Sequence, residues 1–204
     1  MSHGAVILAA GASSRLGVPK QLVRWKKETL LARSIRMAAE AGCHPVVVVL
    51  GACEAQIRSQ CDLSRVQAVS NPRWTDGMGS SLSLGITSLR QEATVGGAII
   101  MTCDMPAVSA GHLLRLAASG KAMASQYADR TGVPAYFPRE DWPALQALRG
   151  PHGARDLLAA AAAIALPGGD LDVDTPDDLR RLHAMESEDP DGLDVACRAA
   201  GNVC

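Results

Sequence analysis

Three short apolar runs constrain the fold of this chain more than any other feature. They cover residues 5–8, 46–50 and 98–101, are rich in β-branched side chains, and carry no polar residue on either face. Strands that are apolar on both faces are typical of parallel sheets buried between two helical layers. The pattern therefore predicts an α/β fold with a three-layer, mostly parallel open sheet.

The segments between these runs have the period of amphipathic helices. Leu31, Ile35 and Ala38 recur at i, i+4 and i+7, and Gly42 follows as a stop, so the first two runs frame a β-α-β unit. A second helix is expected at about residues 80–90, next to the third run along the chain. Its apolar face holds Leu82, Ile86 and Leu89.

Capping residues place three further helix boundaries. Ser109 is a candidate N-cap and Gly120 a candidate residue just past the C-terminus of one helix. Near the end of the chain, a strand is expected to finish at Asp174, with Thr175 as N-cap and Asp178 at the capping-box position of a last helix. The pattern fades from residue 186 onward, where acidic residues, proline and glycine accumulate. We expect one domain over residues 1–185 and a loosely packed tail over residues 186–204.

Composition excludes several classes of protein. The 204 residues, 48% of them apolar, suffice for one substantial core. Lys and Arg total 20 against 21 Asp and Glu, which argues against binding nucleic acid or an anionic membrane by bulk electrostatics. The six cysteines form no C-x-x-C pair, and neither a signal-peptide pattern nor a membrane-spanning run is present. These features predict a soluble, cytoplasmic protein with reduced thiols.

The first apolar run leads into a loop with two glycines and several cations, LAAGASSRLGVPKQLVRW, residues 8–25. Gly11 and Gly17 allow tight turns with amide groups facing inward, and Arg15 and Lys20 add positive charge. Polyphosphate is the natural ligand of such a concavity, although an ordinary loop with solvated cations is an equal alternative. The spacing is that of neither a Walker A loop nor G-x-G-x-x-G, because Ser13 stands at the second glycine position of the latter.

A carboxylate follows the third apolar run. Asp104 comes at the end of the expected strand and is followed by Met105 and Pro106, which end the ladder. Mg²⁺ prefers one or two carboxylates together with phosphate oxygens and water. Asp104 with either Asp172 or Asp174 would suffice, although an aspartate before a helix is equally often only a cap.

Six segments in this order resemble the MobA-like nucleotidyltransferases, and among them most closely the molybdenum cofactor cytidylyltransferases. They are ILAAGASSRLGVPKQLV, NPRWTDGMGSSLSLGI, TCDMPAVS, GVPAYF, GPHGARDLL and DVDTPDDLRRL, and together they extend from residue 7 to residue 182. The resemblance implies a Rossmann-like sheet of the nucleotide-diphospho-sugar transferase type. It also implies a Mg²⁺-dependent transfer of CMP from CTP to molybdopterin, with release of pyrophosphate.

The resemblance carries specific roles onto this sequence. The backbone of the first loop would bind the nucleotide, as would the start of the helix near residue 80, and the positions concerned are Leu8, Ala9, Ala10, Gly11, Gly79, Ser80 and Ser81. Arg15 and Lys20 would bind the phosphates and act in catalysis together with Asp104. Asp104 and Asp174 would hold the Mg²⁺.

The chain departs from the family pattern where the acceptor would bind. Cytidylyltransferases of this branch typically have G-H-P where this chain has Gly132-Val133-Pro134, and G-D-x-G-A-R where it has GPHGAR at residues 150–155. Arg155 is retained and would contact an anionic acceptor, and His152 would restore some of the lost polarity. Two other functions stay open: transfer to another phosphorylated acceptor, or non-catalytic binding and delivery of a cofactor to a molybdoenzyme client.

The first loop also bears on the choice of base. Guanylyl-transferring relatives typically read L-A-G-G in this loop, whereas this chain reads Leu8-Ala9-Ala10-Gly11. The methyl group of Ala10 narrows the space beside the base, so we expect CTP to be preferred over the purine nucleotides.

Overall fold

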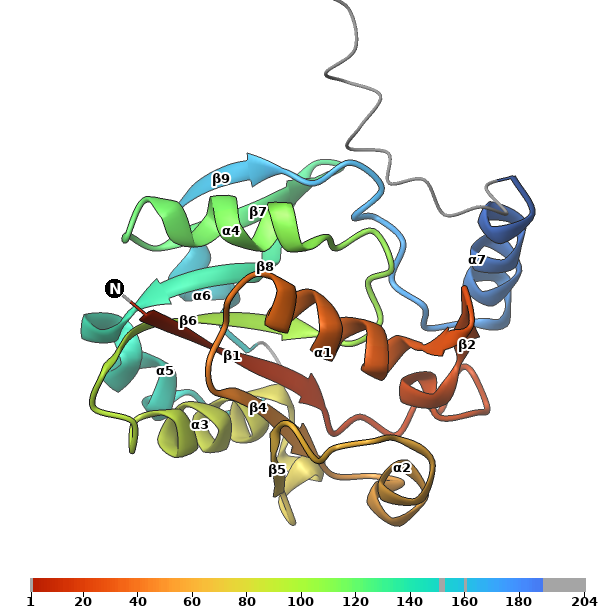
Figure 1. The fold of residues 1–204 in the computed structure, drawn as a ribbon, viewed down its shortest axis with the longest axis horizontal. Helices are drawn as coiled ribbons and strands as arrows, with labels where there is room; N and C mark the ends of the chain where they lie inside the picture. The colour runs from red at the N-terminus through yellow and green to blue at the C-terminus, as the bar shows by residue number, and fades with distance from the viewer. Residues whose placement is uncertain (1, 151–152, 160, 189–204) are drawn as a thin grey trace, which may run out of the picture.

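The computed structural model describes residues 2–150, 153–159 and 161–188 (Figure 1). In this part of the chain, seven strands form one sheet in the order β5-β4-β1-β6-β8-β7-β9. The strands are β1 Ser2–Ala9, β4 Val46–Leu50, β5 Gln67–Ser70, β6 Val95–Thr102, β7 Met123–Tyr127, β8 Arg130–Pro138 and β9 Ala162–Ala165. A separate two-stranded ribbon joins β2 Arg24–Trp25 to β3 Glu28–Thr29.

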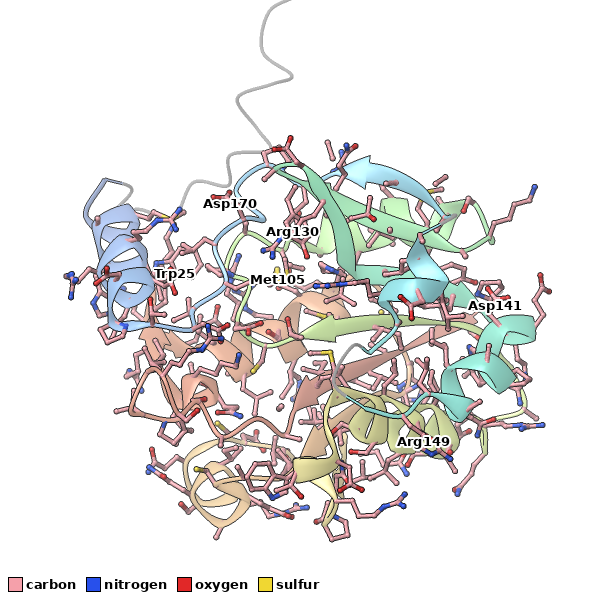
Figure 2. All side chains as sticks on the ribbon, turned by 180° about the vertical axis from the view of Figure 1, so that it is seen from behind. Trp25, Met105, Arg130, Asp141, Arg149 and Asp170 are labelled. Carbon is pink, nitrogen blue, oxygen red and sulfur yellow. The ribbon has the colours of Figure 1, made fainter. Side chains whose placement is uncertain are left out.

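Helices cover both faces of the sheet. Figure 1 shows α1 Leu30–Glu40 and α4 Ala110–Ala118 in front, and the view from behind in Figure 2 shows α3 Met78–Leu89, α5 Trp142–Ala147 and α6 Arg155–Leu158 on the other face. The remaining α-helices are α2 Glu54–Gln60 and α7 Pro176–Glu188, and short 3₁₀ turns cover Lys20–Leu22, Trp74–Asp76 and Arg139–Asp141. The predicted three-layer α/β fold is therefore confirmed.

Strand direction decides which residues meet at one edge of the sheet. The pairs among β5, β4, β1 and β6 are parallel, as is β7 with β9, whereas β8 runs antiparallel to both β6 and β7. The start of β8 therefore lies at the edge where β1 and β6 end. This arrangement brings Arg130 and its neighbours to the same edge as Asp104.

Two apolar clusters pack against the two faces of the sheet. One joins strand residues to Leu31 and Met37 of α1 and to Leu113 of α4, and the other joins alternate strand residues to Leu82 and Ile86 of α3. A third, smaller cluster packs α7 against the β2–β3 ribbon. Burial on both faces explains why the central strands read as continuous apolar runs.

Most of the boundaries predicted from capping residues are confirmed. The Ser109 side chain accepts a hydrogen bond from the amide of His112, and Gly120 has a φ of +64° just past α4. At the start of α7, the Thr175 amide donates to Asp178 at 2.9 Å, and the Asp178 amide donates to Thr175 Oγ1 at 3.2 Å, which is a complete capping box. The helix expected at residues 80–90 begins two residues earlier, at Met78.

The prediction that a strand ends at Asp174 is wrong. Residues 171–174 belong to neither a strand nor a helix, and the Val173 amide donates a single bond of 3.0 Å to the carbonyl oxygen of Asp104. Leu171 and Val173 are buried in the third cluster, under α7. The alternation of apolar and polar residues in this segment therefore reflects one buried face. The segment has no neighbouring strand to pair with, so it forms no ladder.

Helix α7 continues to Glu188 and so includes the first three residues of the predicted tail, and the rest of that segment lies outside the described residues. The four cysteines in the described part of the chain, Cys43, Cys53, Cys61 and Cys103, are not paired with one another. No helix among the described residues is both long and apolar enough to cross a membrane.

Candidate functional site

A cavity of about 600 Å³ opens at the carboxyl ends of β1 and β6. Such an edge is the usual place for ligands in open α/β sheets. Nine of the residues proposed from the sequence line it, although they lie far apart in the chain: Leu8, Ala10, Gly11, Lys20, Ser81, Asp104, Arg155, Asp172 and Asp174. Met105 and Arg130, labelled in Figure 2, also line this cavity, from the segment that follows β6 and from the start of β8.

An ionic cluster of Lys20, Asp104 and Asp174 forms part of the cavity wall. Lys20 Nζ donates to Asp104 Oδ2 at 2.5 Å and to Asp174 Oδ1 at 2.8 Å, and the Lys20 side chain is only 18% exposed. Burial by itself lowers the pKa of Lys20, but the Asp104 charge and the hydrogen bonds to both carboxylates raise it above its ordinary value. The lysine is therefore a permanent cation held between two carboxylates.

Arg15 lies at the outer rim of this cluster. Its guanidinium donates to Asp174 Oδ2 at 2.8 Å, while its side chain is 71% exposed and does not line the cavity wall. The two cations of the first loop thus both bind Asp174, one from the inside and one from solvent. An exposed guanidinium beside a buried ammonium is suited to a long anion that enters from solvent.

Gln21 holds the first loop in place. Its side chain is fully buried, and Nε2 donates to the carbonyl oxygens of Ala9 at 2.7 Å and Gly11 at 3.1 Å. One amide group thus binds both ends of the turn that follows β1. Gln21 is not among the residues predicted from the sequence, because a polar residue between Lys20 and Leu22 does not by itself indicate such a contact.

The two loop glycines serve different purposes. Gly17 has a φ of +79°, which favours glycine, as the tight-turn interpretation predicts. Gly11 is not among the residues with positive φ, and a methyl group added to it would meet nothing within 4 Å. Because Gly11 lines the cavity, the missing side chain leaves its backbone open to a ligand.

Asp104 has an oxygen that the protein leaves without a partner. Asp104 is 5% exposed, and its Oδ1 is buried without a hydrogen bond, whereas Oδ2 binds Lys20. An orphaned, buried carboxylate oxygen next to a second carboxylate fits a hard divalent cation. No group of three or more potential ligands occurs within the described residues, so the remaining ligands of such a cation would be phosphate oxygens and water.

Asp172 and Asp174 both line the cavity but have different partners. Asp172 Oδ2 accepts from Arg130 at 3.2 Å, while Asp174 binds Lys20 and Arg15. Burial, followed by the nearby Asp104 charge, raises the pKa of Asp172 to about 6. Asp174 is thus the second carboxylate that shares Lys20 with Asp104.

The start of α3 is less open than the sequence suggests. The Gly79 amide donates to the Gly150 carbonyl at 2.9 Å, and Ser80 Oγ lies 2.9 Å from the carbonyl oxygens of Arg73 and Gly77. The Gly79 amide and the Ser80 hydroxyl are thus hydrogen-bonded to backbone carbonyl groups of the protein. Among the predicted positions Gly79, Ser80 and Ser81, only Ser81 lines the cavity. The two serine hydroxyls accept from Asn71 Nδ2 at 2.9 Å each.

The opposite wall of the cavity comes from β7, β8 and α6. Arg155 lines it as expected from the sequence, whereas His152 lies outside the described residues. Tyr127 and Arg130 also line this wall, and the Arg130 guanidinium stacks over the Tyr127 ring at 5.1 Å. These two residues are not predicted from the sequence, because neither belongs to a motif that shows where β8 lies in the sheet.

A mostly parallel sheet with a cationic loop and paired carboxylates at its carboxyl edge defines a nucleotide-binding protein of the nucleotide-diphospho-sugar transferase fold. Residues 5–165 match the MobA-like NTP transferase domain. The chain belongs to this family, as the six sequence segments predict.

Comparisons with individual proteins agree with the family. The chain is 32% identical over 123 residues to a nicotine blue oxidoreductase of Paenarthrobacter nicotinovorans, and 31% identical over 129 residues to the "Probable molybdenum cofactor guanylyltransferase" of Opitutus terrae. Each match covers 60% of this chain and about 60% of the relative. The crystal structure of the Rv0371c protein from Mycobacterium tuberculosis is 30% identical, with a TM-score of 0.75 over 89% of this chain and 98% of that one, and the protein has also been solved with manganese.

Proposed function

We propose that this protein is a Mg²⁺-dependent cytidylyltransferase that transfers CMP from CTP to molybdopterin and releases pyrophosphate. The observation that carries the proposal is the meeting of Lys20, Asp104 and Asp174 at the wall of one cavity, beside the backbone of the first loop. A buried ammonium and two carboxylates, one with an unpartnered oxygen, are the groups needed to hold a metal-bound triphosphate.

The loop residues would bind the nucleotide in two ways. The backbone at Ala10 and Gly11 faces the cavity, and Lys20 and Arg15 supply positive charge for the phosphates. Both cations are bound to carboxylates in this structure, so phosphate oxygens would replace Asp104 and Asp174 as their partners. Bound by these two aspartates, Mg²⁺ would supply the charge that neutralises the α- and β-phosphates. The manganese complex of the related Rv0371c protein supports a divalent cation in this family.

The proposed reaction needs positioning more than acid–base chemistry. A phosphate of the acceptor attacks the α-phosphorus in line, a new P–O bond forms, and the bond to pyrophosphate breaks. A phosphate monoester is largely ionised near neutral pH, so no protein group must remove a proton from it. Lys20 would stabilise the negative charge that develops as pyrophosphate leaves.

We base the proposed preference for CTP on the packing around Ala10, which limits the space beside the base. A methyl group built on Gly51 would lie 2.9 Å from Ala10 Cβ and 2.7 Å from Trp74 Cβ, so these three residues are in close contact. This packing prevents Ala10 from moving aside for a larger base. A methyl group contributes about 1–3 kcal/mol to such discrimination, and the Ser81 hydroxyl could add a hydrogen bond to the cytosine edge. The guanylyltransferase relative makes GTP the principal competitor.

The test is pyrophosphate release from CTP, GTP, ATP and UTP, each with Mg²⁺ and purified molybdopterin. We expect release with CTP at a rate at least tenfold above that with GTP, in line with the free energy of discrimination that the Ala10 methyl group contributes. In a matched variant, Ala10→Gly, the rates of pyrophosphate release with CTP and with GTP should differ less than in the wild-type protein. Faster release with GTP in the wild-type protein would overturn the base assignment. Nucleotide binding without release would favour another phosphorylated acceptor or a non-catalytic delivery protein.

A further inference from the structure

Strand β8 contains a bulge where it borders the cavity. Ala124 pairs with Ala135 and Ser125 pairs with Gly132, so Val133 and Pro134 have no partners on β7. We call residues 132–134 the β8 bulge. Gly132 and Val133 both line the cavity, and bulges commonly redirect a strand beside a functional site.

Side chains of β7 bind the carbonyl groups that the bulge removes from the ladder. The Tyr127 hydroxyl donates to the Val133 carbonyl at 3.1 Å, and Ser125 Oγ donates to the Pro134 carbonyl at 2.5 Å. Ser125 is completely buried. Strand β7 therefore holds the bulge through side chains at the point where backbone pairing fails.

A buried histidine extends this support away from the cavity. His112 Nε2 lies 2.7 Å from Ser125 Oγ, and Arg115 lies 3.3 Å from His112 Nδ1. The Pro134 carbonyl can only accept, so the single Ser125 proton goes to it and His112 must donate from Nε2. Nδ1 is then the acceptor for the guanidinium. The hydrogen bonds run in one direction, from Arg115 through His112 and Ser125 to the bulge.

The protonation of His112 agrees with this direction. Burial, reinforced by the positive charge of Arg115, lowers the pKa of His112 to about 4. The imidazole is therefore neutral near pH 7 and can accept at Nδ1. A charged ring would place two donors against each other at the Arg115 contact, which would break the chain of hydrogen bonds.

We propose that Ser125 and His112 are positioning residues for the acceptor, which they serve by holding the β8 bulge in the cavity wall without touching the substrate. This inference rests on the proposed function, and on the expectation from the sequence that the phosphorylated acceptor binds beside residues 132–134. The bulge sits close against its support, since a methyl group on Gly132 would lie 2.6 Å from the Tyr127 hydroxyl. The nucleotide loop has a separate support in Gln21, so the two supports act on different substrates.

The test compares Ser125→Ala with the wild-type protein in three measurements. We expect the KM for molybdopterin to rise about tenfold, because the Pro134 carbonyl and His112 Nε2 lose a buried partner. Hydrogen–deuterium exchange should become faster in residues 130–138. The Kd for CTP, measured by calorimetry, should stay within twofold of the wild-type value.

Ser34→Ala is the matched control. Ser34 is also buried and donates to a carbonyl, that of Leu30, but it lies within α1 and does not line the cavity. It should change none of the three measurements beyond its effect on overall stability. His112→Gln, which keeps a side-chain N–H donor, should stay near wild type, whereas His112→Leu should behave like Ser125→Ala. This pair decides the question even where Ser125→Ala folds poorly.

Two results would overturn the inference. One is unchanged exchange and unchanged KM for the acceptor in Ser125→Ala and His112→Leu. The other is a loss of CTP affinity as large as the loss for the acceptor, since that would indicate general destabilisation. Failure of the wild-type protein to transfer CMP to molybdopterin would instead refute the proposed function. The exchange and CTP-binding measurements would then still decide whether Ser125 and His112 hold the bulge independently of the loop.

Discussion

The first loop and the β8 bulge face each other across one cavity, yet they are held by different kinds of interaction. The loop at residues 10–20 follows directly from β1, and its supporting residue, Gln21, is next along the chain. The bulge depends on Ser125 and Tyr127 of a neighbouring strand, and beyond them on His112 of α4. The loop is thus built from local sequence, whereas the bulge exists only once β7, β8 and α4 have come together.

The two sides also differ in charge. The loop side carries Lys20 and Arg15 against Asp104 and Asp174, an arrangement suited to a metal-bound triphosphate. The support of the bulge is a chain of neutral groups that begins at one cation. Changes to the loop side should therefore affect nucleotide and metal, while changes behind the bulge should affect the acceptor and the response to pH.

Asp104→Asn should have the largest effect on the loop side. It keeps the size of the side chain but removes the charge that a divalent cation and Lys20 both need, so turnover should fall about a thousandfold. Steady-state kinetics with increasing Mg²⁺ measure this. Asp170→Asn, at an exposed pair with Arg181, is the control and should keep normal turnover. Normal turnover in the folded Asp104→Asn protein would refute the assignment of Asp104 to the metal site.

Lys20→Ala should weaken CTP binding about a hundredfold, since a buried ammonium beside phosphates contributes several kcal/mol. The sequence alone predicts little effect on stability, because Lys20 reads as an exposed loop cation. The structure corrects this: its loss would leave the Asp104 carboxylate without its partner beside Asp174, and because the ion pairs are only part-buried we expect a cost of about 1–3 kcal/mol. Melting curves with and without Mg²⁺, with Lys121→Ala as the control in an exposed turn, measure this cost. An unchanged Kd for CTP would refute the assignment of the loop.

The neutral chain behind the bulge predicts an effect of pH on stability. Folding lowers the pKa of His112 from 6.5 to about 4. The contribution of the neutral imidazole to the free energy of unfolding is therefore fully present above pH 6.5 and is lost as the pH falls toward 4. At pH 5 the loss amounts to about 2 kcal/mol. Melting temperatures of the wild-type protein and His112→Gln between pH 7.5 and pH 4.5 measure it. The wild type should lose more stability than the variant; parallel curves would contradict a buried neutral histidine.

Gln21→Met should have the smallest effect of the four. It keeps the volume of the side chain but removes the amide that binds the carbonyls of Ala9 and Gly11, so the Kd for CTP should rise about fivefold. The KM for the acceptor should not change, which is the reverse of the pattern expected for Ser125→Ala. Calorimetry and steady-state kinetics on both variants make this comparison. Equal effects of the two variants on both substrates would show that the two walls are not independent.

The sequence by itself predicted the features that arise from residues close together in the chain. The β-α-β unit, the cationic loop after β1, Asp104 at the end of β6 and the capping box of Thr175 and Asp178 all follow from local patterns. Parallel strands place their carboxyl ends at one edge, so the meeting of Lys20 with Asp104 was predictable as well. Asp174 lies in the same site although the segment before it is not the strand that its sequence pattern predicts.

Only the tertiary structure decided the rest, because those features depend on pairings between distant segments. The antiparallel placement of β8 brings Arg130 and the bulge to the cavity, and nothing local in the sequence specifies that direction. The contact between His112 and Ser125 joins a helix to a strand, so neither residue reads as part of a site until the two elements pack. A one-residue change of register would turn Ser125 to the other face of the sheet, and register is set by side-chain packing across the whole sheet.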